Sequence, residues 1–370
     1  MIQVTRRKKK GKREADLKDL PVEVIPHTIS RSKAQEIFGS VGWKQLPDEV
    51  YKRVRVQPAV YTVEEHHVAV YAGKDNQTIV KADRPKDLLR NSILTPSLAA
   101  SIMNAKYVNG LPLYRISQEF LRNDIHISKQ VMANWMIQCA DRYLGPLYDY
   151  LHKELYSYHI IQADETPVLV NHDGRKAGSK SWMWVYRSGH LYQKRQIVLY
   201  EYQQTRNASH PREFLKGYDG ICVTDGYQVY HTLEKELEEL TIAGCWVHCR
   251  RRFDEALKLV PKSCQKESNA FLLMKQIQAI YREEGKLKDL SSDERLKQRQ
   301  VVIRPLVDAF FAYLKTIKVS KKDKFGDAVG YALNQEKYLR VFLTDGDIPI
   351  DNNASERQSG VFVSGRRIGR

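Results

Sequence analysis

Hydrophobic and polar positions in the middle of the chain predict a sheet with helices between its later strands. Five apolar runs of strand length, rich in branched and aromatic residues, cover residues 160–170, 181–186, 196–203, 220–225 and 241–247. Helical spacing of apolar residues follows the last three runs, at 211–215, 229–240 and 250–259. The predicted order of elements is therefore β-β-β-α-β-α-β-α.

This order is that of a ribonuclease-H-like domain, and it predicts the α/β fold class. In such a domain three antiparallel strands are joined to two strands that are reached through helical crossovers. Acids on the first and fourth strands then meet at the centre of the sheet, and here those strands carry Asp164 and Asp225. We expect Pro167 to end the regular pairing of the first strand, because proline lacks the N–H that a strand ladder uses.

Changes in pattern and charge divide the chain into six expected parts. The first three are a disordered basic arm (1–20), a small β-rich unit (21–94) and a helical DNA-binding region (95–150). The last three are the ribonuclease-H-like catalytic core (151–260), an inserted helical subdomain (261–344) and a shortened segment with a glutamate-bearing helix (345–370). The arm has no apolar periodicity, so it either lies along phosphates or is a solvated tail.

The helical region at 95–150 has the layout of a helix-turn-helix. Thr95 precedes Pro96 at a good helix start, a short helix is expected at 113–121, and Ser128 is placed to cap a third helix. We expect one face of that helix to be apolar, formed by Val131, Trp135 and Cys139. The residues expected to face a DNA groove are Lys129, Gln130 and Asn134. An ordinary helical bundle is the alternative interpretation.

Charge and composition narrow the class of partner. The net charge is +16 and the isoelectric point is near 9.4, so a polyanion is expected, with nucleic acid first and an acidic protein as the alternative. The five cysteines are an odd number scattered through the chain, which fits a reducing compartment. No apolar run approaches the ~18 residues of a membrane span, so we expect a cytoplasmic, nucleoid-associated protein without membrane contact.

Three acids in specific settings are the candidate chemistry: Asp164, Asp225 and Glu356. Phosphodiester cleavage and strand transfer use two divalent ions about 3.5–4 Å apart, and hard carboxylate oxygens suit Mg²⁺. Each acid also has a plainer interpretation. The first strand could simply run into a polar turn, Asp225 with Gly226 could be a strand-ending turn, and Asn353 with Glu356 could cap a helix.

A second group of ligand-like residues follows the fifth apolar run, in the stretch Cys245-Trp-Val-His248-Cys249. It lacks a second ligand pair, so we expect no zinc there. His248, Arg250 and Arg251, together with the next arginine, are interpreted as facing phosphate near the acids.

The chain resembles the IS66 family of bacterial insertion-sequence transposases. The resemblance is carried by stretches at 106–115, 163–167, 224–227, 243–251 and 350–357. It implies a DDE transposase in which the three acids bind Mg²⁺, with Mn²⁺ as a substitute, and in which Arg357 is a further DNA contact. It also implies double-stranded DNA partners (terminal inverted repeats and target), a homo-oligomer on DNA and element-encoded helper proteins.

The chain departs from the family pattern in three places. It has no leucine-zipper-like segment at its start, and the counterpart of the family's zinc-binding stretch, roughly 30–80, has no cysteine. After the glutamate it ends at Arg370 without the family's basic segment and helical tail. These departures keep two alternatives open: a shortened, inactive DNA-binding remnant, and a ribonuclease-H-like nuclease without strand transfer.

Overall fold

The computed structural model describes residues 22–28, 30–41, 47, 53, 60–72, 79–170, 174–176, 178–189, 195–318 and 323–359. Two compact units make up the chain, residues 1–83 and 84–370. The expected basic arm and the residues after Ser359 lie outside the described residues.

The first unit contains one α-helix, a short 3-10 helix η1 (Gly39–Val41) and one small hairpin among its described residues. Helix α2 (Arg31–Phe38) is capped by Ser30, whose hydroxyl accepts the Lys33 N–H at 3.3 Å. Strand β1 (Val70–Ala72) pairs antiparallel with β2 (Ile79–Lys81). In this unit the side chain of Ala34 is buried, and the other described side chains are exposed or partly exposed. The sequence pattern indicated strands in this unit and did not indicate α2, because the helix lacks a clear apolar stripe.

The second unit begins with a helical part that has its own hydrophobic cluster. Its elements are α3 (Pro96–Met103), η2 (Asn104–Val108), α4 (Leu113–Leu121), α5 (Lys129–Cys139), η3 (Ala140–Leu144) and α6 (Gly145–Leu155). The predicted caps are confirmed, since Thr95 Oγ1 accepts the Leu98 N–H and Ser128 Oγ accepts the Val131 N–H. On the predicted apolar face of α5, Trp135 and Cys139 are buried as expected, but Val131 is not. Val131 is exposed, whereas Met132 is fully buried beside Trp135.

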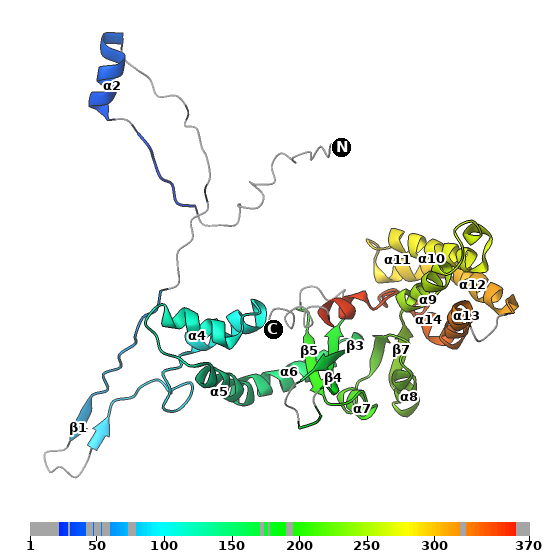
Figure 1. Ribbon diagram of the computed structural model, residues 1–370, viewed down its shortest axis with the longest axis horizontal. Coiled ribbons are helices and arrows are strands. Elements are labelled where there is room, and N and C mark those ends of the chain that lie inside the picture. The colour runs from blue at the N-terminus through cyan, green and yellow to red at the C-terminus, as the bar shows by residue number, and fades with distance from the viewer. Residues whose placement is uncertain are drawn as a thin grey trace. The chain divides into compact units, whose positions relative to one another are not determined.

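A five-stranded mixed sheet follows, formed by β3 (Ile160–Leu169), β4 (Lys180–Ser188), β5 (Val198–Gln203), β6 (Gly220–Thr224) and β7 (Leu240–Gly244) (Figure 1). The strand order is β5-β4-β3-β6-β7. Neighbouring strands are antiparallel from β5 to β3 and parallel from β3 to β7. The mixed α/β class predicted from the sequence is confirmed.

Two details of the sheet correct the sequence analysis. Pro167 does not end pairing, because it lies opposite Trp182 within the β3–β4 ladder. On the other side of β3, pairing with β6 stops at Gln162, so one edge is open beyond that residue and tolerates a proline. The fifth strand ends at Gly244 rather than at 247, since Trp246 already belongs to the next helix. Its apolar side chain continues the buried pattern on the helix.

The two faces of the sheet support two hydrophobic clusters. Successive strand residues point to opposite faces, and Ile160 and Val223 belong to one cluster while Ile161 and Cys222 belong to the other. Helix α9 (Trp246–Lys258) packs in the first cluster, and α7 (Ser209–Phe214) and α8 (Gln228–Glu236) pack in the second (Figure 1).

The region expected as a helical insertion is helical and shares the first of these clusters. It contains η5 (Gln265–Glu267), α10 (Asn269–Lys286), α11 (Ser292–Gln298), η6 (Arg299–Ile303), α12 (Arg304–Thr316), α13 (Lys324–Asn334), α14 (Glu336–Leu339) and η7 (Val341–Leu343). The Trp246 ring centroid lies 5.5 Å from that of Phe310 and 6.3 Å from that of Phe342. The insertion and the sheet are therefore parts of one core.

A buried arginine fixes the loop that leaves this insertion. Arg299 donates from Nη1 to the carbonyls of Phe342 (2.8 Å) and Asp345 (2.6 Å), and from Nη2 to that of Ile348 (2.9 Å). Its guanidinium also pairs with Glu284. A helix over residues 353–359 follows this loop, so Arg299 determines where that helix begins.

Replacing this arginine tests the role of the buried pair. Arg299→Met leaves the Glu284 carboxylate, which is 13% exposed, without its partner and also removes three carbonyl contacts. We expect the free energy of unfolding to fall by about 3–5 kcal/mol, measured by urea unfolding followed by circular dichroism. The control is Arg282→Met, which removes a pair whose arginine is 69% exposed and should change stability by less than ~1 kcal/mol. Equal stability of the two variants would contradict the role given to Arg299.

Candidate active site

The three predicted acids are carried by three different elements. Asp164 lies in the middle of β3, just beyond the end of pairing with β6. Asp225 directly follows β6, and Glu356 lies on the helix over residues 353–359. By strand alternation, Asp164 shares the sheet face of Ile160, and Asp225 shares that of Val223, which is the same face. The two aspartates therefore project toward the cluster that contains α9.

Electrostatic coupling shows that these carboxylates are neighbours. Burial, together with the charges of Asp225 and Glu356, raises the pKa of Asp164 to about 6, while a hydrogen bond from Ser359 opposes the shift. Ser359 Oγ donates to Asp164 Oδ2 at 2.7 Å. The helix that carries Glu356 is thereby joined to the first acid directly.

A fully buried asparagine attaches the same helix to the sheet. Asn352 Nδ2 donates to the carbonyl of Ala163 (2.8 Å), and its Oδ1 accepts from Gln162 Nε2 (3.1 Å). Its backbone N–H donates to Cys245 Sγ at 3.2 Å. From β4, Arg187 Nη1 donates to the carbonyl of Ala354 at 3.0 Å. These contacts fix the start of the helix next to Asp164.

The sequence analysis did not identify this anchoring. It considered Asn353 as the cap, but Asn353 is the first helical residue, and the Asn352 carbonyl accepts the N–H groups of Ser355 and Glu356. Of the residues involved, only Gln162 gave a signal, as a polar residue within an apolar strand. Which of two adjacent asparagines is buried depends on a strand nearly two hundred residues away.

The turn after β6 has a structural role as well as a candidate chemical one. Asp225 Oδ1 accepts the Tyr227 N–H at 2.8 Å, so the plainer interpretation of Asp225 as a turn residue also holds. A Cβ at Gly226 would lie 2.6 Å from the hydroxyl of Tyr331, on α13. The close approach of this ring explains the glycine.

A fourth carboxylate lies on the opposite face of β3. Glu165 is buried, pairs with Arg206 and accepts from the Tyr230 hydroxyl at 3.3 Å. Burial, and next the Asp225 charge, raise its pKa to about 7, while Arg206 lowers it. The Arg206 guanidinium carbon lies 3.8 Å from the ring centroid of Tyr227 and 4.7 Å from that of Trp182. Glu165 directly follows Asp164 in the sequence. That position was the available signal, and Glu165 was not among the predicted site residues.

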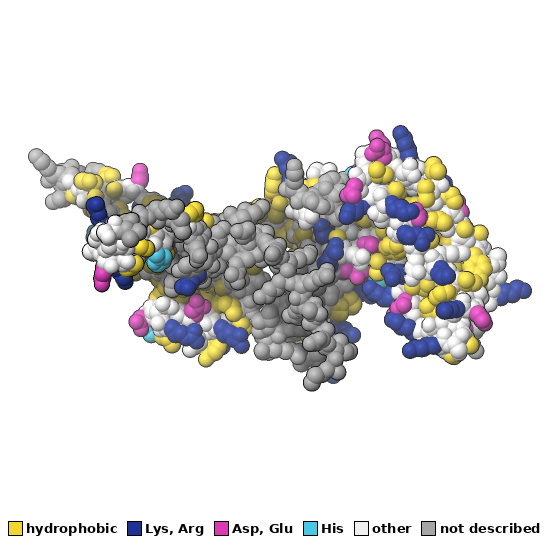
Figure 2. All heavy atoms as spheres, turned by 90° about the horizontal axis from the view of Figure 1, so that it is seen from above, with side chains coloured by type: hydrophobic (Ala, Val, Ile, Leu, Met, Phe, Trp, Pro, Cys, Tyr) yellow, Lys and Arg dark blue, Asp and Glu magenta, His cyan; other side chains and the backbone are white. Residues whose placement is uncertain are grey.

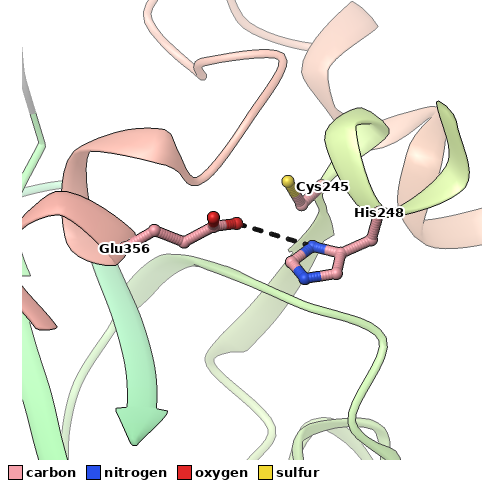
Figure 3. A group of neighbouring side chains, drawn as sticks. All are labelled: Cys245, His248 and Glu356. Atoms are coloured by element: carbon pink, nitrogen blue, oxygen red, sulfur yellow. Dashed lines mark ion pairs between the residues drawn. The ribbon is translucent and has the colours of Figure 1, made fainter. Parts of the chain in front are cut away.

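Two of the predicted phosphate-facing residues lie beside Glu356. His248 Nδ1 is 3.8 Å from Glu356 Oε1 (Figure 3). Arg251 Nη2 is 3.6 Å from Glu356 Oε2. Burial lowers the pKa of His248, and the charges of Asp225 and Glu356 oppose that shift. Both side chains come from the first two turns of α9. The Arg251 guanidinium balances part of the acidic charge.

The remaining predicted contacts are exposed and lie apart from this group. Arg250 is exposed on α9, with its guanidinium carbon 5.9 Å from the Tyr281 ring centroid, and Arg357 is exposed on the last described helix. On α5, the side chains of Lys129, Gln130 and Asn134 are exposed along the first turns. The contacts described here do not bring these last three residues to the acids.

The donor set at the three acids fits divalent metal ions. It consists of carboxylate oxygens, which hard cations such as Mg²⁺ prefer, and a cation would offset the burial and repulsion that raise the pKa of Asp164. The ligand atoms of the three acids do not all lie within 4.8 Å of one another, whereas those of Cys245, His248 and Glu356 do, as the one such group among the described residues.

The part of the chain that contains the three acids is similar to known proteins. The model of the family described as "Transposase IS66 family" matches residues 91–369. Two similar proteins come from Sinorhizobium fredii (strain NBRC 101917 / NGR234), the uncharacterized proteins y4qI and y4jD. The first is 31% identical over 317 residues, which are 83% of this chain and 58% of that protein. The second is 27% identical over 289 residues, 75% of this chain and 55% of that protein. This chain thus spans less than two thirds of the length of either relative.

Two adjacent asparagines allow a matched test of the anchor. Asn352→Ala leaves the Gln162 amide and the Ala163 carbonyl buried without a partner, so we expect a loss of about 1–3 kcal/mol in unfolding free energy. The control, Asn353→Ala, changes a partly exposed side chain and should stay within ~0.5 kcal/mol of the parent. Urea unfolding measures both. The anchoring role is wrong if Asn353 proves the more sensitive position.

The raised pKa of Asp164 has a measurable cost in the metal-free protein. Its folded pKa, about 6, exceeds the ordinary value of 3.8 for an aspartate, so the charged folded form is penalised above pH 6 and the penalty disappears toward pH 4. In EDTA, Asp164→Asn should therefore be more stable than the parent at pH 8, by as much as ~3 kcal/mol. This gain should shrink steadily as the pH falls to 4.5. Urea unfolding across that range tests it, and a gain that is constant with pH would contradict the assignment.

Proposed function

Because the chain belongs to the IS66 family of transposases, we propose that it carries the catalytic part of a DNA transposase, which cuts element ends and transfers the strands to target DNA. One observation above all supports the proposal. Three acids from distant parts of the sequence converge closely enough for Asp225 and Glu356 to raise the pKa of Asp164. DDE transposases in general use divalent metal ions bound by acids of this kind, and we propose Mg²⁺ here.

The proposed fold of this part is ribonuclease-H-like. The strand order β5-β4-β3-β6-β7 supports it, with three antiparallel strands joined to two parallel ones that are reached through helices. The first and fourth strands in chain order supply Asp164 and Asp225 on one face. The helical region from 261 to 344 is then an insertion between the second and third acids.

Each residue of the site has a proposed task. A pair of Mg²⁺ ions, when bound, would activate the attacking oxygen and stabilise the leaving oxygen. Asp164 and Asp225 would bind them from the rigid sheet, and Glu356 would complete the set from its anchored helix. Arg251 and His248 lie within 4 Å of Glu356, so they would orient its carboxylate and attract the DNA phosphates.

DNA binding is proposed to involve surfaces beyond the acids. Lys129, Gln130 and Asn134 are exposed at the start of α5, as expected of residues that enter a groove. Figure 2 shows Lys and Arg side chains spread over its right-hand part among acidic and apolar ones. With a net charge of +16, affinity should fall steeply as salt rises. We propose duplex element ends and target DNA as partners, bound by a homo-oligomer, in the cytoplasm with the nucleoid.

A membrane role finds no support in the helices. No helix among the described residues is long and apolar enough to cross a membrane.

The test is a nicking assay on duplex DNA taken from both sides of the gene. The protein would be incubated with Mg²⁺ or with EDTA, next to Asp164→Asn, Asp225→Asn and Glu356→Gln. We expect nicks at a defined end that require Mg²⁺, and a loss on the order of 10³-fold or more in each variant, equivalent to at least ~4 kcal/mol of transition-state stabilisation. Glu236→Gln, which changes an exposed acid paired with Arg212, should nick like the parent.

The products separate the proposal from its rivals. Nicked ends that become joined to target DNA support a transposase, and nicks that are never joined support a nuclease. Binding to the ends without nicks supports an inactive remnant. Undiminished nicking in any of the three acid variants would overturn the proposed triad.

A further inference from the structure

A second set of metal ligands lies beside the acids and shares one of them. The ligand atoms of Cys245, His248 and Glu356 all lie within 4.8 Å of one another. Figure 3 shows the three side chains directed toward a common space, two from the start of α9 and one from the helix opposite. Cys245 is the N-cap residue of α9, and His248 lies one turn further on. Residues three apart on a helix share a face, so the first two ligands are positioned by local geometry alone.

Two of these ligand atoms are buried without a hydrogen-bond partner. His248 Nδ1 and Glu356 Oε1 are shielded from solvent and have no such partner among the described residues. They face each other at 3.8 Å, whereas Arg251 approaches the other oxygen of Glu356. Oε1 is therefore available to a further cation, and so is the ring nitrogen. Orphaned buried polar atoms are costly, and one bound ion would satisfy both.

The third ligand is held in place by the anchor of the glutamate helix. Cys245 is 1% exposed, and its Sγ accepts the backbone N–H of Asn352 at 3.2 Å. The same segment thus positions the thiol and the carboxylate. Cys249, which the sequence places close to Cys245, is fully buried in the hydrophobic cluster around α9 and is not part of the set.

The chemistry of the three donors selects the kind of ion. A sulfur, an imidazole nitrogen and one carboxylate oxygen suit Zn²⁺ or Co²⁺, whereas Mg²⁺ prefers oxygen donors throughout. We propose that Cys245, His248 and Glu356 bind a thiophilic divalent cation, Zn²⁺ or Co²⁺, and that this binding inhibits the reaction at the three acids. The sequence analysis expected no zinc here because it found no second ligand pair, and Glu356 is the ligand that it lacked.

Binding must displace a proton. A thiol binds such an ion as the thiolate. The ion forms a bond to sulfur as the thiol proton leaves to solvent, and affinity therefore rises with pH. A water molecule completes the four positions that Zn²⁺ prefers.

Inhibition follows from the shared ligand, and this part rests on the proposed function. When Glu356 binds the thiophilic ion, Asp164 and Asp225 lose the third acid of their set. Zn²⁺ then competes with catalysis although it occupies a different position from Mg²⁺. The metal site itself does not depend on that function, and so it can be tested in the absence of DNA.

The first experiment is a titration of the full chain with Co²⁺ in the absence of Mg²⁺ and DNA. We expect one equivalent to give the near-ultraviolet charge-transfer band of a cobalt–thiolate bond. Cys245→Ser, which keeps an acceptor for the Asn352 N–H, should lose the band. The matched control is Cys264→Ser, because Cys264 is an exposed free cysteine, and it should retain the band. A band that disappears in Cys264→Ser but persists in Cys245→Ser overturns the site, and so does the absence of any band in the parent.

Two further variants verify the other ligands. His248→Gln and Glu356→Gln should retain a thiolate band but bind Co²⁺ at least ~10-fold more weakly, because each loses one ligand. Unchanged affinity in both variants would also overturn the site. Thermal unfolding of each metal-free variant identifies any that fails to fold.

The second experiment adds Zn²⁺ to the nicking assay at constant, excess Mg²⁺. The parent and Cys264→Ser should be inhibited, and Cys245→Ser should need at least ~10-fold more Zn²⁺ for the same inhibition. Equal inhibition of parent and Cys245→Ser overturns the regulatory part. If no variant nicks DNA under any condition, the proposed function fails, while the cobalt titration still decides the metal site.

Discussion

The amide of Asn352 is the contact on which the arrangement of the site depends. Its two polar ends bond to consecutive residues of β3, one to the side chain of Gln162 and one to the carbonyl of Ala163. The next residue of that strand is Asp164. A change in the register of the segment by one residue would therefore break both bonds and move Glu356 relative to Asp164. Because the amide is fully buried, water cannot replace either partner.

The helical insertion supports this contact from the other end of the segment. Arg299 binds three carbonyls between Phe342 and Ile348, and Arg295 donates to that of Gly346 at 2.9 Å. The backbone N–H of Trp246 then donates to the Ile350 carbonyl at 3.1 Å. The chain is thus held at short intervals from the insertion to the start of the glutamate helix. Since the insertion shares its hydrophobic core with the sheet, it acts as part of the frame of the site.

The local sequence pattern predicted the features that depend on interactions between residues close together in the chain. The order of strands and helices along the chain, the caps Thr95 and Ser128, and the helical nature of 261–344 follow from periodicity and capping chemistry that a short window contains. Features decided by distant partners were not predictable in this way. The buried face of α5 depends on which side the neighbouring helices cover, so Met132 and not Val131 is buried. The end of β7 depends on packing of Trp246, a residue whose type suits strand and helix equally.

The same limit applied to the candidate site. The three acids were recognisable from their settings and from the family resemblance, but nothing near them in sequence indicated Asn352, Ser359 or Arg187 as their supports. Each of these acts across more than 160 residues of chain. The link between Cys245, His248 and Glu356 is equally long-range, and so two ligands looked like an incomplete set.

Glu356 comes much later in the sequence than the other two acids, so it is also synthesised later. A ribosome makes Asp164 and Asp225 first, then the whole insertion, and only then the helix that bonds to β3. At 5–20 residues per second, the interval between the second and third acids is roughly 7–25 seconds. During that interval the emerging chain can fold its sheet but has no complete set of acids. The proposed three-acid site can therefore form only after the insertion that supports it has been made.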